Sequence, residues 1–386
     1  MREPDFYLLD ELLTPEERMV RDTVASFVER EFLPKVNEHF DKVSFPMELV
    51  PRMAELGIFG ANLKGYGCAG MNDMSYGLIM QELERGDSGL RSFATVQGAL
   101  SMFPIWSFGN EEQKQKWLPR MARGEALGAF GLTEPDFGSN PKAMRTRAKK
   151  SGKKFILNGS KMWITNGTVA EIAVIWAQTE QGIRGFLVEK GTPGFTSHEI
   201  KQKYSLRCSL TAELFFEDCE IPEENILPGV KGLGSALACL DQARFGISFG
   251  SVGAAAACYV CARDYALKRI QFGGKPIASH QLMQEKLADM LTEITKAQLV
   301  CLRLGRLKEA GKANWSQISL AKRSNLRMAR DVARTAREIL GAAGIVLDFP
   351  VIRHFVNLES VYTYEGTNDI HTLILGQAIT GIPAFE

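Results

Sequence analysis

The sequence predicts an α+β fold, mostly α-helical, in three consecutive parts: a helical domain (1–125), a middle antiparallel β-barrel domain (126–228) and a C-terminal four-helix bundle (229–386). Three observations predict it. Apolar residues recur at helical spacing in the first third, short β-type runs bounded by turn residues fill the middle, and long alanine-rich segments of helical period follow Gly232. Because 386 residues exceed the size at which one hydrophobic core usually stops growing, several packed units are expected.

The first domain begins with a strong helix start signal. Thr14 is a candidate N-cap, Pro15 occupies the first helical position, and Glu17 stands where it completes a capping box. Further helical patterns cover about 46–60, 72–86, 90–107 and 110–123.

Short β-type runs mark the middle domain. They lie at 155–157, 172–176, 185–189, 195–198 and 213–217, and Asn-Gly and Pro-Gly pairs separate several of them. Regular spacing without long helices between the strands suits an antiparallel barrel or sandwich. The C-terminal third then shows long helical segments, at about 233–270, 279–310, 315–344 and 351–381, whose lengths suit an antiparallel four-helix bundle.

Composition excludes some function classes. The net charge of +1 gives no electrostatic basis for binding nucleic acid or an anionic membrane. Cys258 and Cys261 form a C-x-x-C pair in apolar surroundings with no second pair nearby, so reduced helical thiols are expected and no metal site. Without a targeting pattern or a long apolar run, we expect a cytoplasmic protein with no membrane insertion; a trimmed mitochondrial matrix protein would look the same.

The heptad Thr363–Asp369 is the first candidate for chemistry. Its Glu365 lies between Tyr364 and Gly366, so a carboxylate could act as a base where the backbone approaches a ligand closely. A solvated helix end is the competing interpretation, because Glu is usually exposed.

Other motifs suit a flat heteroaromatic cofactor. Phe130–Ser139 is a Gly-rich loop with hydroxyl donors, and Lys161–Gly167 places Trp163 and Thr165 at the end of a strand. A structural turn and a core tryptophan are the alternatives. Arg269–Gly273, with Gln281 beyond it, and the 338–344 helix end could contact a pyrophosphate or serve only as helix caps.

Four of these motifs, G-L-T-E-P, W-I-T-N, R-x-Q-F-G and Y-E-G-T, occur in the order found in the acyl-CoA dehydrogenase family, which the chain resembles from about Phe6 to Phe385. The resemblance implies FAD at a subunit interface of a homotetramer, with electrons passed to electron-transfer flavoprotein. It implies that Glu365 is the catalytic base. The residues that it assigns to FAD are Phe130, Leu132, Thr133, Gly138, Ser139, Trp163, Ile164, Thr165, Arg269, Phe272, Gln281, Glu338, Gly341, Ala342, Thr367 and Asp369.

The chain departs from the family's pattern at a few positions. Asn140 stands where many relatives have Asp, Glu338 where many have Gln, and Ala342-Ala343 replaces part of a glycine pair. These departures concern single FAD contacts and not the cofactor itself.

Within the family, the chain is most similar to the members that oxidise glutaryl-CoA. Arg91 stands where those relatives bind the distal carboxylate of the substrate, and a guanidinium in an apolar pocket needs an anionic partner. Such a charge-assisted contact is worth about 1.5–3 kcal/mol. The residues assigned to the substrate are Arg91, Ser92, Glu84, Ser139, Asp241, Arg244, Tyr364 and Gly366.

The implied reaction is the oxidation of glutaryl-CoA followed by loss of CO2. Glu365 would remove the α-proton while a hydride leaves the β-carbon for the flavin, and glutaconyl-CoA would then decarboxylate to crotonyl-CoA. Glu84, one helical period from Arg91, and Tyr364 match the decarboxylating members. The alternatives are a glutaryl-CoA dehydrogenase that stops at glutaconyl-CoA, a dehydrogenase for another short-chain acyl-CoA, and a relative that only binds its ligands.

Overall fold

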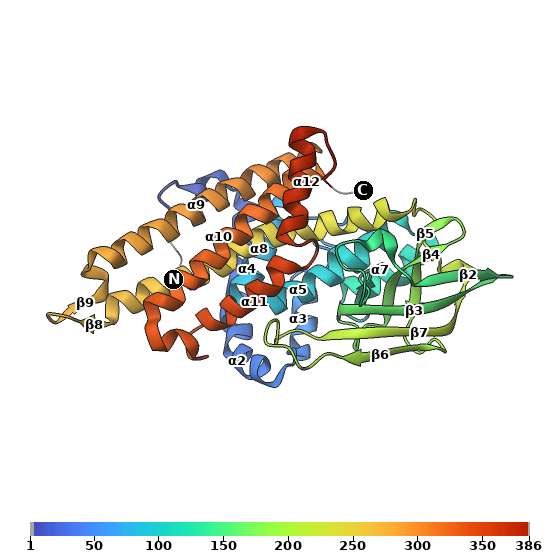
Figure 1. The fold of residues 1–386 in the computed structure, drawn as a ribbon, viewed down its shortest axis with the longest axis horizontal. Helices are drawn as coiled ribbons and strands as arrows, with labels where there is room; N and C mark the ends of the chain where they lie inside the picture. Colours follow the sequence, from blue (N-terminus) through green and yellow to red (C-terminus); the bar gives the residue numbers. More distant parts are fainter. Residues whose placement is uncertain (1–3, 385–386) are drawn as a thin grey trace.

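The computed structural model describes residues 4–384 and has the mostly helical fold that the sequence predicts, with a β domain between two helical parts. In Figure 1 the strands of the middle domain lie at one end of an elongated molecule, and the helices from the first and last thirds pack side by side along the rest of it. One large apolar core runs through both helical parts, and a second, smaller core lies within the β domain.

The N-terminal helices are α1 (Pro15–Phe27), α2 (Leu33–Lys42), α3 (Val50–Glu55), α4 (Asp73–Gly86), α5 (Ser88–Thr95), α6 (Phe103–Phe108) and α7 (Glu111–Ala122). The predicted capping box is present: the Glu17 amide donates to Thr14 Oγ1 at 3.2 Å, and the Thr14 amide donates to the Glu17 carboxylate at 2.8 Å.

Two predicted N-terminal helices differ from the structure. The segment 46–60 holds only a 3₁₀ turn (Met47–Leu49) and the short α3, because the backbone turns at Gly57 and Gly60, whose φ angles are positive. The segment 90–107 divides into α5, a π-helical stretch (Val96–Met102) and α6. Within that stretch a Cβ at Gly98 would lie 3.0 Å from the Gly60 nitrogen, so the two backbones approach closely.

The middle domain has the strands β1 (Gly128–Gly131), β2 (Arg147–Ser151), β3 (Lys154–Thr165), β4 (Ile172–Thr179), β5 (Gly182–Glu189), β6 (Phe195–Glu199) and β7 (Thr211–Pro222). Their order is β1-β4-β2-β3-β7-β6, and β5 pairs with β4 on its other edge. The sheet is not wholly antiparallel as expected, since β4 pairs in parallel with β1 and, at one position, with β2. Long connections return the chain to β4 in the parallel direction.

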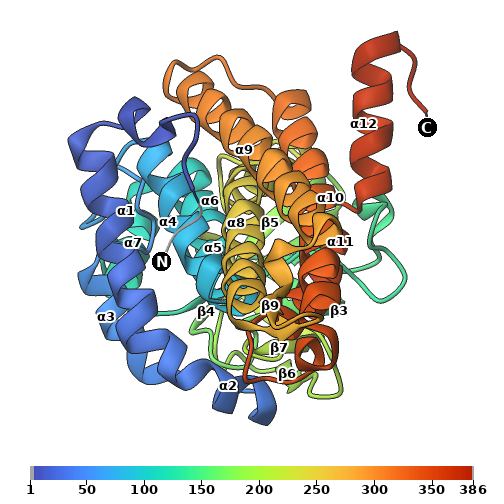
Figure 2. The ribbon, with the colours of Figure 1, turned by 90° about the vertical axis from the view of Figure 1, so that its left-hand side faces the viewer.

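The C-terminal helices are α8 (Leu233–Lys268), α9 (Gln281–Glu309), α10 (Trp315–Leu340), α11 (Val351–Thr363) and α12 (Asn368–Thr380), and a small hairpin of β8 (Ile270–Gln271) and β9 (Lys275–Pro276) joins α8 to α9. The predicted single helix over 351–381 is therefore wrong: it is interrupted at residues 364–367. Figure 2 shows α12 projecting away from the rest of the bundle. The interruption contains the candidate base.

Helix α8 corrects the expectation that the chain holds no long apolar run. Within residues 4–384 it is the one helix long and apolar enough to cross a membrane, with a mean hydropathy of 1.6 in its most apolar window. However, 83% of that window is buried inside the fold. Figure 1 shows α8 beside α4 and α10, so its apolar surface forms the centre of the helical core.

Candidate active site

The candidate base lies in the turn between α11 and α12. Glu365 has a φ of 55°, a left-handed conformation that is unfavourable for a residue with a Cβ, and Gly366 follows with a φ of 94°. A Cβ at Gly366 would lie 2.9 Å from His371 Nε2 and 3.3 Å from Arg244 Nη2. Thr367 then caps α12, accepting from the Ile370 amide at 3.2 Å. Glycine is thus required where the turn packs against its neighbours.

Two buried cations hold this turn. Lys322 Nζ, on α10, donates to the carbonyls of Tyr364 and Gly366 at 2.8 and 2.7 Å. Arg244 Nε, on α8, donates to the Glu365 carbonyl at 2.7 Å. Three consecutive carbonyls therefore accept from side chains that come from two other helices.

Sequence reasoning singled out Arg244 but missed Lys322, His371 and Tyr76. The signal for Lys322 was present in the sequence. It is a lone cation on the apolar stripe of α10 that includes Ile318 and Ala329, where a charge is costly unless it is paired.

The Glu365 carboxyl is in a mixed environment. Burial raises its pKa above the ordinary value of 4.5, while Arg91, Lys322 and Arg244 oppose that shift. Its Oε2 is buried and has no hydrogen-bond partner among the residues that the structure describes. A carboxyl with a raised pKa and a free oxygen can take up and return a proton, as a general base requires.

Arg91 lies fully buried at the start of α5. Its Nε donates to Glu84 Oε2 at 2.7 Å, and its Nη2 donates to the Tyr364 hydroxyl. The third donor group, Nη1, is buried without a partner within residues 4–384. Glu84 also accepts from Ser88 Oγ at 2.8 Å, so its own position is fixed.

The expected proximity of Glu84 and Arg91 holds, but not through one helix turn. Helix α4 ends at Gly86 and α5 begins at Ser88, with Asp87 extended between them and capping α5 through the Gly89 amide at 2.6 Å. Helix α8 leaves room for the pair, since a Cβ at Gly250 would lie 2.0 Å from Glu84 Oε2. The guanidinium is therefore held by packing from three helices.

The other residues assigned to the substrate do not all lie near Glu365. Ser92 is buried beside Arg91 in the sequence, and Arg244 Nη1 donates to Asp241 Oδ1 at 3.0 Å beneath the Glu365 turn. Burial raises the pKa of Asp241 while Arg244 opposes the shift. Ser139 lies instead in an exposed loop after β1, together with Gly138. The structure therefore groups Glu84, Arg91, Tyr364, Arg244 and Gly366 around Glu365 and leaves Ser139 outside this group.

The two motifs suggested for a flat cofactor meet on the β domain. The Met162 amide donates to the Thr133 carbonyl at 2.9 Å, and Lys161 Nζ donates to the Leu132 carbonyl at 3.0 Å and to Glu134 Oε1 at 2.9 Å. The Glu134 carboxylate also accepts from the Arg145 and Thr146 amides at 2.6 and 2.9 Å. A buried ion pair therefore joins the loop to the strand.

Trp163 provides the test of whether these residues fit FAD. A register shift in β3 between Lys161 and Ile164 turns the Trp163 backbone to a φ of 65°, and its side chain is 56% exposed instead of joining the core. Phe130, Leu132 and Ile164 are buried, whereas Thr133 and Thr165 are half-buried. An outward-facing indole beside hydroxyl donors suits a flat heteroaromatic ring, so the residues present fit a flavin.

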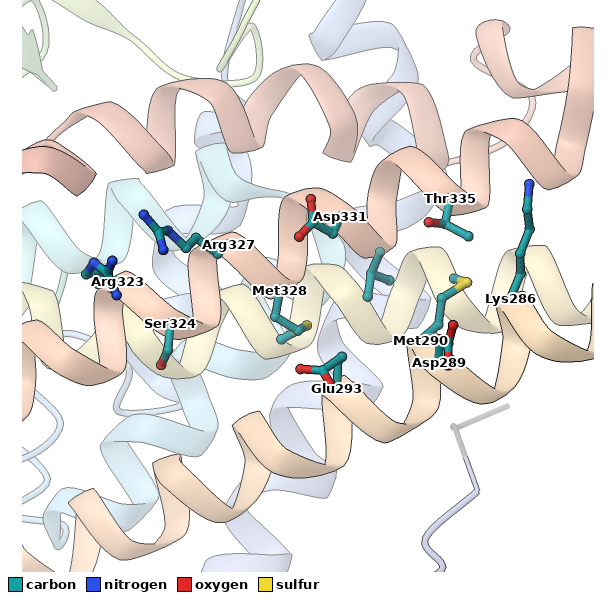
Figure 3. Close-up of a pocket in the computed structure, with 11 residues that line it drawn as sticks. Lys286, Asp289, Met290, Glu293, Arg323, Ser324, Arg327, Met328, Asp331 and Thr335 are labelled. Atoms are coloured by element: carbon teal, nitrogen blue, oxygen red, sulfur yellow. The ribbon is translucent and has the colours of Figure 1, made fainter. Parts of the chain in front are cut away.

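The residues suggested for the pyrophosphate of FAD lie near the C-terminal end of α8, away from the Glu365 turn. Arg269, Gly341 and Ala342 line a cavity of about 520 Å³ together with Tyr265 and Gln271. Phe272, Gln281 and Glu338 do not line it: Phe272 is 84% exposed, and Glu338 pairs with Lys286 at 3.0 Å. Asp369 is exposed on the first turn of α12. A separate pocket of about 450 Å³ between α9 and α10, lined by both charged and apolar residues, contains none of the predicted site residues (Figure 3).

The Glu365 turn, beneath which Arg244 lies, and the Arg269 cavity are far apart in one chain. Arg244 and Arg269 are 25 positions apart on or at the end of the same helix, which corresponds to roughly 37 Å at 1.5 Å per residue. An extended dinucleotide cannot span that distance.

Comparisons with known proteins agree with this geometry. Family models for the N-terminal, middle and C-terminal domains of acyl-CoA dehydrogenases match residues 14–125, 129–219 and 230–380. The chain is 38% identical to an acyl-CoA dehydrogenase of Bacillus subtilis (strain 168), over 96% of this chain and 99% of that protein.

Two solved structures are also similar. A glutaryl-CoA dehydrogenase of Mycobacterium smegmatis in complex with FADH2 is 50% identical, with a TM-score of 0.97 over 98% of both chains. A glutaryl-CoA dehydrogenase in complex with glutaryl-CoA is 32% identical, with a TM-score of 0.92 over 96% of both chains. The buried carboxyl, the flavin-type face and these matches lead to one conclusion: the chain belongs to the acyl-CoA dehydrogenase family, the FAD-dependent oxidoreductases that act on the CH–CH group of acyl-CoA thioesters.

Proposed function

We propose that this enzyme oxidises glutaryl-CoA at its α and β carbons and then releases CO2 to give crotonyl-CoA, with electrons passed to electron-transfer flavoprotein. The observation that carries the proposal is Arg91: a fully buried guanidinium, one of whose donor groups has no partner in the part of the chain described.

The unsatisfied N–H donor of Arg91 favours an acyl chain that ends in a carboxylate. Glu84 neutralises the guanidinium, but one carboxylate cannot satisfy its five N–H donors. A plain fatty acyl chain would leave the Nη1 donor desolvated, whereas a distal carboxylate could accept from it. An advantage of about 1.5–3 kcal/mol corresponds to roughly ten- to a hundredfold in kcat/KM.

Glu365 would act as the base at the α carbon. Its buried Oε2, which has no hydrogen-bond partner between residues 4 and 384, is available to take the proton, and the raised pKa allows the carboxyl to hold it afterwards. When bound, FAD supplies the acceptor for the electron pair that leaves the β carbon. The half-buried turn around Glu365 would shield the reacting carbons from water.

The second step follows from the contact between Tyr364 and Arg91. Glutaconyl-CoA is a vinylogous β-keto acid: when the bond between the γ carbon and the distal carboxylate breaks, CO2 leaves and the electron pair delocalises through the double bond into the thioester, giving a dienolate. The proton held by Glu365 then returns to the γ carbon, which gives crotonyl-CoA with atoms and charge balanced. Tyr364 accepts from Arg91 and would orient the guanidinium toward the departing carboxylate.

The relatives and the subunit geometry support the remaining parts of the proposal. A similar protein is named glutaryl-CoA dehydrogenase and binds FADH2, and another is complexed with glutaryl-CoA. Because the Arg269 cavity and the Glu365 turn of one chain are too far apart for one FAD, we propose a homo-oligomer, with a homotetramer as the expected state.

Anaerobic mixing with glutaryl-CoA tests the function. We expect bleaching of the flavin absorbance, followed by one equivalent of crotonyl-CoA and CO2 per turnover. Butyryl-CoA serves as the comparison substrate. A kcat/KM for butyryl-CoA that equals or exceeds the value for glutaryl-CoA would favour the alternative of a general short-chain dehydrogenase. Glutaconyl-CoA as the final product would favour the alternative that does not decarboxylate.

A further inference from the structure

We propose that Lys322 is a positioning residue for Glu365: its ammonium binds the carbonyl on each side of the base and fixes the direction in which the carboxylate points. The inference deepens the proposed function and rests on Glu365 as the base.

The Lys322 ammonium bridges two carbonyls of the turn by donating a hydrogen bond to each. Its side chain is fully buried, and its Nζ lies 2.8 Å from the Tyr364 carbonyl and 2.7 Å from the Gly366 carbonyl. A cation that merely capped α11 would need only the first contact, because Tyr364 is the C-cap of that helix. The second contact crosses Glu365 and closes the turn from both sides.

The turn needs such a bridge. Glu365 is held in a left-handed conformation, at a cost of order 1–3 kcal/mol that the surroundings must offset. The regular helical bonds end on either side of it, with the Tyr364 amide donating to Ser360 and the His371 amide to Thr367. Between those bonds, the carbonyls of residues 364–366 accept from Lys322 and Arg244.

The charge of Lys322 also lowers the pKa of Glu365. Burial raises the pKa of Glu365, and Lys322 is one of three cations that oppose the shift. The other groups that face the carboxyl are Arg91 from α5, Arg244 from α8, Tyr76 from α4 and the neighbouring Tyr364, while His371 from α12 faces the backbone of residues 365 and 366. Burial lowers the pKa of Lys322 itself to about 7, while Glu365 raises it. The two groups therefore each favour the ionised form of the other.

Two substitutions whose side chains have equal length separate the effect of the Lys322 hydrogen bonds from the effect of its charge. Lys322→Gln keeps N–H donors but removes the charge, and Lys322→Met removes both. We expect kcat to fall about tenfold in Lys322→Gln and about a hundredfold in Lys322→Met, while KM for glutaryl-CoA changes less than about threefold. The acidic limb of the kcat/KM profile should move to higher pH in both variants, because both lose the charge.

Amide hydrogen exchange of the segment 364–371 gives a readout that does not depend on turnover. We expect faster exchange than in the parent protein, moderately in Lys322→Gln and more in Lys322→Met, because the bridge across the turn is weakened and then lost. Bound flavin absorbance and the elution volume show whether each variant is folded. Should Lys322→Met fail to fold, the kcat, pH profile and exchange of Lys322→Gln still test the positioning role.

Arg334→Met is the matched control, since Arg334 is an exposed cation on the same helix. It should leave kcat, the pH profile and the exchange of 364–371 unchanged. Lys322 variants with parental kcat, parental exchange and a parental acidic limb would overturn the role of Lys322 while leaving Glu365 as the base. Substantial activity in Glu365→Gln would instead overturn the proposed base, so the two failures are distinguishable.

Discussion

Arg353 Nη1 donates to Asp87 Oδ2 at 2.6 Å, and this buried pair joins positions 266 residues apart. Asp87 is the residue between α4 and α5, four positions before Arg91, and Arg353 lies in the first turn of α11, which leads to Tyr364. Asn357 strengthens the junction by donating to the same Asp87 oxygen at 2.9 Å. The pair therefore sets the relative position of the two helices that bring Arg91 to Tyr364.

Loss of Arg353 should destabilise the protein strongly. Arg353→Met leaves the Asp87 carboxylate buried without its cation, which typically costs about 3–5 kcal/mol. Urea unfolding monitored by circular dichroism gives the change. Arg330→Met, which breaks the partly exposed pair of Arg330 with Glu359 between α10 and α11, is the control and should cost about 0–1 kcal/mol. Equal effects of the two substitutions would contradict the importance given to burial.

Removal of the Tyr364 hydroxyl should change the product rather than the first step. Tyr364→Phe takes away only the acceptor for Arg91 Nη2, so flavin reduction by glutaryl-CoA should persist while the share of glutaconyl-CoA released rises above that of the parent. Tyr364→Val should raise that share further. The measurement is the yield of labelled CO2 from carboxyl-labelled glutaryl-CoA, and an unchanged yield in both variants would refute the assigned role.

Substrate preference should depend on the Arg91–Glu84 pair as a unit. The double substitution Arg91→Met with Glu84→Met removes both charges and leaves no orphaned ion, so folding should be largely preserved. We expect kcat/KM for glutaryl-CoA to fall about ten- to a hundredfold and that for butyryl-CoA to change little or rise. The single variant Arg91→Met should lose both activities, because Glu84 would then be buried unpaired. Parallel losses for both substrates in the double variant would count against a carboxylate-binding role.

Activity should rise with pH through the titration of Glu365. Burial raises its pKa above 4.5, and the base must be ionised to act, so kcat/KM should show an acidic limb above that value. The titration of Glu365 affects stability in the opposite direction to activity as the pH rises. The folded protein binds this proton more tightly than the unfolded chain does. The resulting contribution to the free energy of unfolding is therefore present below pH 4.5, and it is lost as the pH rises through the pKa of Glu365 in the folded protein. An acidic limb at or below 4.5 would contradict the described environment.

The ion pair of Lys161 with Glu134 should control flavin retention. Lys161→Met leaves Glu134 buried and frees the Leu132 carbonyl, so the loop and the strand that flank the flavin lose their connection. We expect at least a tenfold rise in the dissociation constant of FAD, measured by flavin fluorescence. Lys154→Met on the same strand breaks only the exposed pair with Glu220 and should leave FAD binding unchanged.

The three-part fold could be predicted from the sequence because it depends on local patterns, and a short motif identified the candidate base. Hydrophobic periodicity located α8, α9 and α10, and the Tyr-Glu-Gly-Thr motif within the heptad Thr363–Asp369 indicated Glu365. The contact between Glu84 and Arg91 was expected from their spacing, although a helix break at Asp87 lies between them.

The interruption of the last predicted helix could not be seen in the same way. Residues 351–381 have a helical pattern throughout, and the groups that bind the carbonyls of the break, Lys322 and Arg244, lie 42 and 121 positions away from the residues they contact. Tertiary contacts of this kind override local propensity. The parallel pairing of β1 with β4 was missed for a similar reason, since β1 is short and its partner is distant in the chain.

Helix α8 acts as a spacer of fixed length between two chemical sites. It carries Asp241 and Arg244 under the Glu365 turn and ends at Arg269 beside the other cavity. Inserting one residue between them would turn everything beyond it by about 100° and advance it by about 1.5 Å. In the proposed homo-oligomer, the cavity would then no longer face the flavin of a neighbouring copy. Recombination between family members should therefore succeed only when the segment 241–269 is transferred without insertions or deletions.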